Sequence, residues 1–197
     1  PMLCAIVRQW GHKVIDLGCG TDNRAELREI LKIAAKKCDV ILTSGGASAG
    51  DEDHISALLQ DTGSFALWRV AMKPGRPLAL GLWNGTPVFG LPGNPVAAMV
   101  CALVFSRPAL LILAGGTWSN PLGFPMPAAF SKSKKSGRRE YIRARIENGQ
   151  VIVFESEGSG RVSGLSWACG LVELSDEAQT IEHGDLVKYI PYESYGL

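Results

Sequence analysis

The stretch of sequence that decides the fold reads DVILTSGGASAG, residues 39–50. Residues 39–43 form a short, continuous and mainly apolar run, which predicts a strand buried in a parallel sheet. The run leads directly into a loop, residues 44–50, that holds three glycines and two serines. We therefore place this loop at the carboxyl end of a central strand, where α/β sheets bind their ligands.

The loop fits either an anion site or a tight structural turn. Glycines let the backbone approach a ligand closely, and exposed N–H groups and serine hydroxyls bind anions. No Gly-Lys-Ser/Thr follows and no G-x-G-x-x-G is present, which excludes the two common nucleotide-binding motifs. The candidate binding residues in the loop are Ser44, Gly45, Gly46, Ser48 and Gly50.

Helices and strands alternate on both sides of the loop. Helical spacing is expected at residues 1–10, 23–34 and 53–59, and strands at 12–17, 65–71, 77–83 and 87–91. A long apolar helix begins at residues 92–95 and ends at 115–116, with a proline kink at Pro108. Each of its two apolar pieces, on either side of Arg107, is too short to span a bilayer. This alternation predicts a three-layer α/β domain over residues 1–116.

The pattern changes after this domain. Three prolines between residues 120 and 127 indicate a linker, which we place at 117–127. Strands are expected at 139–146, 151–154, 170–174 and 186–190, with a hairpin turn at 147–150. We predict a small all-β barrel or sandwich domain over residues 128–197.

Composition excludes several classes of function. Hydrophobic residues make up 46% of the chain, charged residues 20%, and the formal net charge is +1. Bulk binding to nucleic acid or to a membrane is therefore not expected. The five cysteines are odd in number and include no Cys-x-x-Cys, which is typical of a reducing, cytoplasmic compartment.

Acidic residues follow the glycine-rich loop directly. Asp51 and Asp53 are in position either to bind Mg²⁺ beside a phosphate or to stabilise the start of the next helix. A stiff basic turn comes later, with Arg69, Lys73 and Arg76 around two prolines and a glycine. Preorganised cations are what a phosphate or oxyanion site needs, although a solvated basic loop has the same composition.

Two further segments carry candidate residues. Pro92, Gly93, Asn94 and Pro95 form either a rigid pocket wall with N–H donors or simply a helix start. In the tail, positive charge is concentrated at Lys132, Lys134, Lys135, Arg138, Arg139 and Arg143. This basic cluster fits either a solvated strand face or an oxyanion contact across a domain or subunit boundary. Residues 158–161, which include Ser159, resemble another small loop of that kind.

Three motifs in this order resemble the molybdopterin molybdotransferase family, which includes bacterial MoeA and the E domain of gephyrin. They are TSGGASAGDED (residues 43–53), MKPGRP (72–77) and GLPGNP (90–95), supported by GRREYIR (137–143) and GSGRVS (158–163). The resemblance implies a molybdopterin-binding α/β domain, incomplete at its N-terminus, followed by a small β-barrel. It also implies that the chain is the C-terminal fragment of a longer enzyme.

The implied reaction inserts molybdate into adenylylated molybdopterin, with release of AMP and assistance from Mg²⁺. By resemblance, Asp53, Lys73 and Arg76 are catalytic, and Asp51 and Asp53 bind the metal. The implied substrate-binding residues are Ser44, Gly45, Gly46, Ser48, Gly50, Arg69, Pro77, Pro92, Gly93, Asn94, Pro95, Arg138, Arg139 and Ser159. Arg76 replaces the family's lysine, and Cys169 replaces its asparagine.

The resemblance also implies partners and leaves alternatives. We expect a homodimer of the full-length protein and a contact with molybdopterin adenylyltransferase. The alternative functions are molybdopterin adenylyltransferase itself, which resembles a single domain, and a gephyrin-like scaffold.

Overall fold

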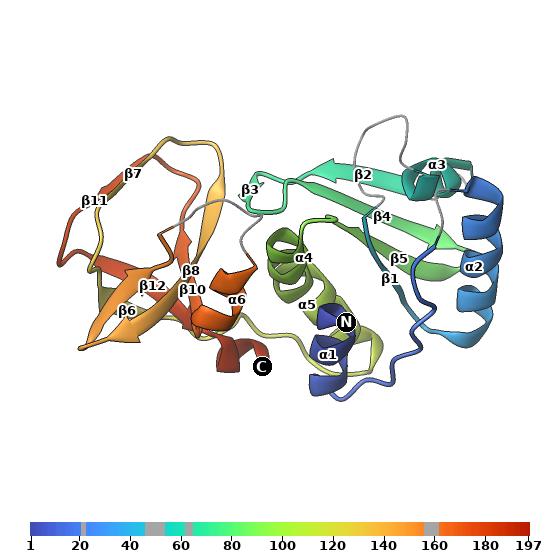
Figure 1. Cartoon of the computed structure of the whole chain (residues 1–197), viewed down its shortest axis with the longest axis horizontal. Helices are drawn as coiled ribbons and strands as arrows, with labels where there is room; N and C mark the ends of the chain where they lie inside the picture. The colour runs from blue at the N-terminus through green and yellow to red at the C-terminus, as the bar shows by residue number, and fades with distance from the viewer. Residues whose placement is uncertain (21–22, 46–53, 62–64, 156–161) are drawn as a thin grey trace.

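The structure is a computed structural model, and it describes residues 1–20, 23–45, 54–61, 65–155 and 162–197. The chain folds into an α/β unit and a sheet-rich unit that lie side by side (Figure 1). Predicted site residues 46, 48, 50, 51, 53 and 159 fall outside the described residues.

The first sheet has the strand order β1-β5-β4-β2. Its strands are β1 (Ile41–Ser44), β2 (Phe65–Arg69), β4 (Pro77–Trp83) and β5 (Thr86–Leu91). As expected, β1 lies in a parallel pair, with β5, and the other two pairings are antiparallel. Asn84 and Gly85 join β4 to β5 with positive φ angles of 49° and 81°, which a type I′ hairpin turn requires.

Helices cover both faces of this sheet, as the alternation predicted. Alternate strand residues point to opposite faces, so Phe89 of β5 packs against α1 (Met2–Gln9) and α4 (Pro95–Cys101). Its neighbour Val88 packs in a second core, against α2 (Arg24–Lys37) and α3 (His54–Asp61). The helix α2 begins at Asn23, whose side chain accepts hydrogen bonds from two backbone N–H groups of the first turn. The three-layer prediction is confirmed.

The long apolar helix predicted from the sequence is confirmed, and it contains a π-helical segment that the sequence did not indicate. The helix α4 runs through a π-helical segment, η1 (Ala102–Ser106), into α5 (Arg107–Leu113). Together they form one helix, Pro95–Leu113, of 19 residues with a mean hydropathy of 2.2, which is long and apolar enough to cross a membrane. Every residue of α4 after Pro95 is buried in the protein core, and this position accounts for the apolar composition.

The second unit contains most of the remaining strands. They are β6 (Phe124–Pro127), β7 (Lys132–Lys134), β8 (Arg139–Glu147), β9 (Gln150–Val153), β10 (Gly170–Leu174), β11 (Gln179–Ile181) and β12 (Leu186–Pro191). The larger sheet has the order β3-β8-β10-β12-β6, β9 pairs with β8, and β7 pairs with β11. Pairing among these described strands forms no closed barrel. In addition, β6 occupies the end of the segment predicted as a linker, and residues 12–17 form no strand.

A short strand and the C-terminus join the two units. The strand β3 (Met72–Lys73) leaves the α/β unit and pairs in parallel with β8, with Lys73 opposite Glu140. After the short helix α6 (Ser163–Trp167) and β10 to β12, the chain ends in the 3-10 helix η2 (Tyr192–Tyr195). The Trp10 indole N–H donates to the Tyr195 carbonyl oxygen at 2.8 Å, and Tyr195 lies in the same core as α4. The hydrophobic core around α4 is therefore shared by the two units, and each unit has a further core of its own.

Candidate functional site

The carboxyl ends of β1 and β5 meet at one edge of the α/β sheet. The Gly45 N–H donates to the Leu91 carbonyl oxygen at 2.9 Å. A Cβ on Gly93 would lie 3.6 Å from Gly45 Cα, so the two loops are in contact. Ser44 and Pro92 flank this contact. The described start of the glycine-rich loop thus lies at the predicted edge, and its role in binding an anion stays a prediction.

Asn94 acts as the N-cap of α4. Its side-chain oxygen accepts hydrogen bonds from the N–H groups of Val96, at 3.0 Å, and Ala97, at 3.3 Å. Pro95 occupies the first turn and has no N–H to offer. The backbone N–H groups at this helix start, which were predicted to bind a ligand, therefore donate to Asn94. The geometry of Asn94 is that of a helix N-cap.

The basic turn packs tightly against α4. It contains a cis peptide bond between Lys73 and Pro74. Gly75 is buried with a φ of 104°, and a Cβ there would lie 2.4 Å from Cys101 Sγ. The Cys101 thiol donates to the Gly75 carbonyl oxygen at 3.5 Å. Burial raises the pKa of Cys101 to about 12, so the thiol stays protonated and keeps this contact at neutral pH.

The other predicted residues of this turn face different surroundings. Arg76 is exposed, and its carbonyl oxygen accepts a hydrogen bond from the Val70 N–H at 2.9 Å. Pro77 begins β4 opposite Arg69 of β2, whose side chain lies outside the described part. Of the site residues predicted in this turn, Lys73 is the one that lines a pocket in the described structure.

This pocket lies where the two units meet. From the α/β unit it is lined by Lys73, Pro74 and Val96, and from the second unit by residues 140–143 of β8 and by Phe154. Its cavity volume is about 40 Å³, and it is open to solvent. Val96 belongs to the same helix start as Asn94, so the pocket adjoins the edge at which the two glycine loops meet.

Among the described residues that line the pocket, Arg143 is the buried cation. From the sequence it was recognised only as a member of the basic cluster, and not as a site residue. Its side chain is 5% exposed, and its guanidinium carbon lies 4.8 Å from the centre of the Phe154 ring. Burial lowers the pKa of Arg143, and Tyr192 opposes that shift. The alternation of side chains along a strand could have indicated that Arg143 is buried, because it places Arg143 on the same face of β8 as the buried Tyr141.

A carboxylate lies between the cations of the two units. Glu140 Oε1 is 3.8 Å from Lys73 Nζ, and Glu140 Oε2 is 3.4 Å from Lys132 Nζ. The basic cluster predicted from the sequence therefore has members close to the pocket.

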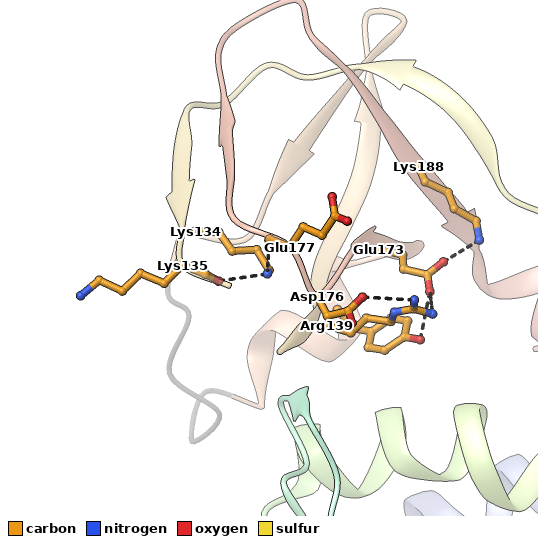
Figure 2. A network of polar contacts seen from close by, with 8 residues as sticks. Lys134, Lys135, Arg139, Glu173, Asp176, Glu177 and Lys188 are labelled. Atoms are coloured by element: carbon orange, nitrogen blue, oxygen red, sulfur yellow. Dashed lines mark hydrogen bonds and ion pairs between the residues drawn. The ribbon is translucent and has the colours of Figure 1, made fainter. Parts of the chain in front are cut away.

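Other members of the cluster do not line it. Arg138 is exposed, and Arg139 pairs with Glu173 at 3.2 Å and with Asp176 at 3.7 Å (Figure 2). Glu173 also binds Lys188 Nζ at 2.5 Å, and Lys134 donates to two backbone carbonyl groups. For Arg138 and Arg139, the geometry matches the interpretation of a charged strand face. Within the described part of the chain, no three His, Cys, Asp or Glu side chains gather as a metal site.

The fold and the pocket define a two-part protein with a pocket at the junction that two cations, Lys73 and Arg143, and the carboxylate of Glu140 line. Residues 1–111 match the family described as a probable molybdopterin binding domain, and residues 125–192 match the MoeA C-terminal region, domain IV. The chain belongs to the molybdopterin-binding domain family and carries the C-terminal domain that MoeA proteins add to it.

Individual relatives agree with this family. The chain is 33% identical over 186 residues to the molybdopterin molybdenumtransferase of Haemophilus influenzae, covering 91% of the chain and 46% of the relative. It is 33% identical to gephyrin of Dictyostelium discoideum, covering 88% and 28%. A crystal structure of the molybdopterin biosynthesis MoeA protein of Pyrococcus horikosii matches with a TM-score of 0.82 and 25% identity, covering 97% and 46%. The chain spans less than half the length of these relatives.

Proposed function

We propose that this chain forms the part of a molybdopterin molybdotransferase that binds molybdate and places it against adenylylated molybdopterin. The reaction transfers molybdenum to the dithiolene of the pterin and releases AMP. The observation that carries the proposal is the pocket at the junction, which Lys73 and the buried Arg143 line from opposite units. The family supports a transferase of molybdenum cofactor biosynthesis with a molybdopterin-related substrate.

The chemistry of the pocket suits a small tetrahedral dianion. A guanidinium group offers several donors in one plane to two oxygen atoms at once, and an ammonium group adds a compact charge. Arg143 lies against the Phe154 ring, so its donors are oriented before an anion arrives. Preorganised cations stabilise bound and developing negative charge better than solvated ones do. Because the formal net charge of the chain is only +1, the attraction is local.

We further propose that the AMP phosphate and Mg²⁺ bind at the adjoining sheet edge. Gly45 and Gly93 carry no side chains at that edge, so a ligand could approach their backbone, and Asp51 and Asp53 follow Gly45 in sequence. Carboxylates beside phosphate groups commonly hold Mg²⁺. The same helix start borders both sites, since Gly93 precedes α4 and Val96 lines the pocket. This arrangement would bring the phosphate end of the substrate close to the oxyanion.

Titration calorimetry of molybdate into the chain tests the pocket. Arg143→Ala should weaken binding at least ten-fold, because a hydrogen bond to a charged group contributes about 1.5–3 kcal/mol. Lys135→Gln is the matched control, since it removes an exposed cation of the basic cluster outside the pocket lining. Absence of molybdate binding to the wild type, or equal affinity of Arg143→Ala, would contradict the proposal.

An assay of the products separates the alternatives. With adenylylated molybdopterin and molybdate, the transferase releases AMP, whereas an adenylyltransferase consumes ATP and releases pyrophosphate. The match of residues 125–192 to MoeA domain IV favours the transferase over a single-domain adenylyltransferase. A gephyrin-like scaffold would show neither reaction. The homodimer, the contact with molybdopterin adenylyltransferase and the cytoplasmic location stay predictions from the family resemblance.

A further inference from the structure

Among the described residues that line the pocket, one is acidic, which is unexpected in a site for an anion. Glu140 lines the pocket beside Arg143, and its side chain is 13% exposed. It is held in the strand pair that joins the units, directly opposite Lys73. Its two carboxylate oxygens reach Lys73 of the α/β unit and Lys132 of the second unit.

A carboxylate in this position has two opposite effects on an oxyanion. It holds two ammonium groups near the pocket, which favours binding. Its own charge repels an incoming dianion, and an ionised carboxylate can only accept hydrogen bonds, so it offers none to a deprotonated oxyanion. At short range and low exposure this repulsion is poorly screened.

We propose that Glu140 is the internal counter-ion of the pocket, which positions Lys73 and Lys132 while lowering the affinity for dianionic oxyanions. It thereby keeps bound molybdate exchangeable, so that the anion can leave for the next step. This inference rests on the proposed function, because it presumes that the pocket binds an oxyanion. It makes Glu140 a positioning residue and not a catalytic one.

The isosteric variant Glu140→Gln separates the two effects. Glutamine keeps the shape and one acceptor for a lysine, but it removes the negative charge. We expect the dissociation constants of molybdate and tungstate to fall about ten-fold, equal to about 1.4 kcal/mol. Loss of a purely structural ion pair would instead leave the affinity unchanged or weaken it, so the sign of the change is decisive.

Glu173 provides a matched control on the same sheet. Its side chain is 11% exposed, it also binds two cations, Arg139 and Lys188, and it does not line the pocket (Figure 2). Glu173→Gln still offers an oxygen to the Tyr141 hydroxyl and should leave oxyanion affinity at the wild-type value. Tighter binding by both variants would indicate a general charge effect and would overturn the assignment to Glu140.

The experiment is calorimetric titration of molybdate and tungstate into the wild-type chain and both variants, with thermal melts of each. If Glu140→Gln melts too low to titrate, Glu140→Asn removes the same charge, keeps an amide oxygen as an acceptor and carries the same expectation of tighter binding. Equal or weaker binding by the folded variant overturns the inference. Failure of the wild type to bind either anion overturns the proposed function as well, so the two failures are distinguishable.

Discussion

Adding one methyl group at Gly164 tests whether the position of the Arg143 guanidinium determines oxyanion binding. Gly164 is buried in α6, and a Cβ there would lie 2.4 Å from Arg143 Nη1 and 2.8 Å from Phe154 Cδ1. Real Cβ atoms essentially never approach heavy atoms so closely, so in Gly164→Ala the guanidinium, the ring or both must move. Because the two stack at 4.8 Å, displacing one displaces the other.

Two terms of opposite sign set the expected change in stability. Overpacking a filled site costs about 1–3 kcal/mol. Replacing glycine by alanine within a helix gains up to about 1 kcal/mol. The net loss should therefore be about 0–3 kcal/mol, less than the stability of about 5–15 kcal/mol that is usual for a folded domain. Molybdate affinity should fall about ten-fold, because a misplaced charge-assisted hydrogen bond forfeits about 1.5 kcal/mol or more.

The assay combines a thermal melt with calorimetric titration of molybdate. Ser166→Ala is the matched control, because Ser166 is exposed on the same helix and its hydroxyl donates to the Ser163 carbonyl oxygen at 3.0 Å. That variant should bind molybdate as the wild type does. A folded Gly164→Ala protein with wild-type affinity would refute the reasoning, since the guanidinium must have moved without consequence.

Two further predictions concern the glycine-rich loop and the buried thiol. Asp53→Asn in the intact enzyme should lower molybdenum insertion about 100- to 1,000-fold with little change in melting temperature; near-normal turnover of a well-folded variant would remove Asp53 from the mechanism. Burial raises the pKa of Cys101 from 9.0 to about 12, so above pH 9 the unfolded chain loses a proton that the folded chain keeps. The corresponding stability is fully present below pH 9 and is lost as pH rises from 9 towards 12. Denaturant unfolding across that range should show a flatter pH dependence for Cys101→Ala, and identical slopes would contradict the assignment.

Features with a local chemical signal could be predicted from the sequence. The Asn-Gly pairs at 84–85 and 148–149 sit at hairpin turns, where Asn84, Gly85, Asn148 and Gly149 all have positive φ angles. Asn23 caps α2 as its side chain predicts. The parallel strand before the glycine-rich loop is also where the sequence placed it. In each case a few neighbouring residues determine the local conformation of the backbone.

Features that depend on distant partners could not be predicted. Residues 12–17 have the composition of a strand, but Ile15 and Leu17 are exposed and the segment pairs with no described strand. The sequence predicts a kink in the long apolar helix at Pro108, but it does not predict the π-helical segment Ala102–Ser106 that precedes the proline. The proline-rich segment ends in β6 because β12 offers it an edge.

The pocket itself shows why composition alone could not select its residues. Arg139 and Arg143 belong to one basic run on one strand, yet Arg139 is bound by Glu173 at the surface and Arg143 is buried in the pocket. Pairing of β3 with the first two residues of β8 places Lys73 opposite Glu140 and brings the basic turn to the pocket that Arg143 lines. The absence of a side chain at Gly164 then leaves space for the guanidinium. Site chemistry therefore depends on a two-residue strand pairing and a missing methyl group, and neither has a signal in the charge pattern.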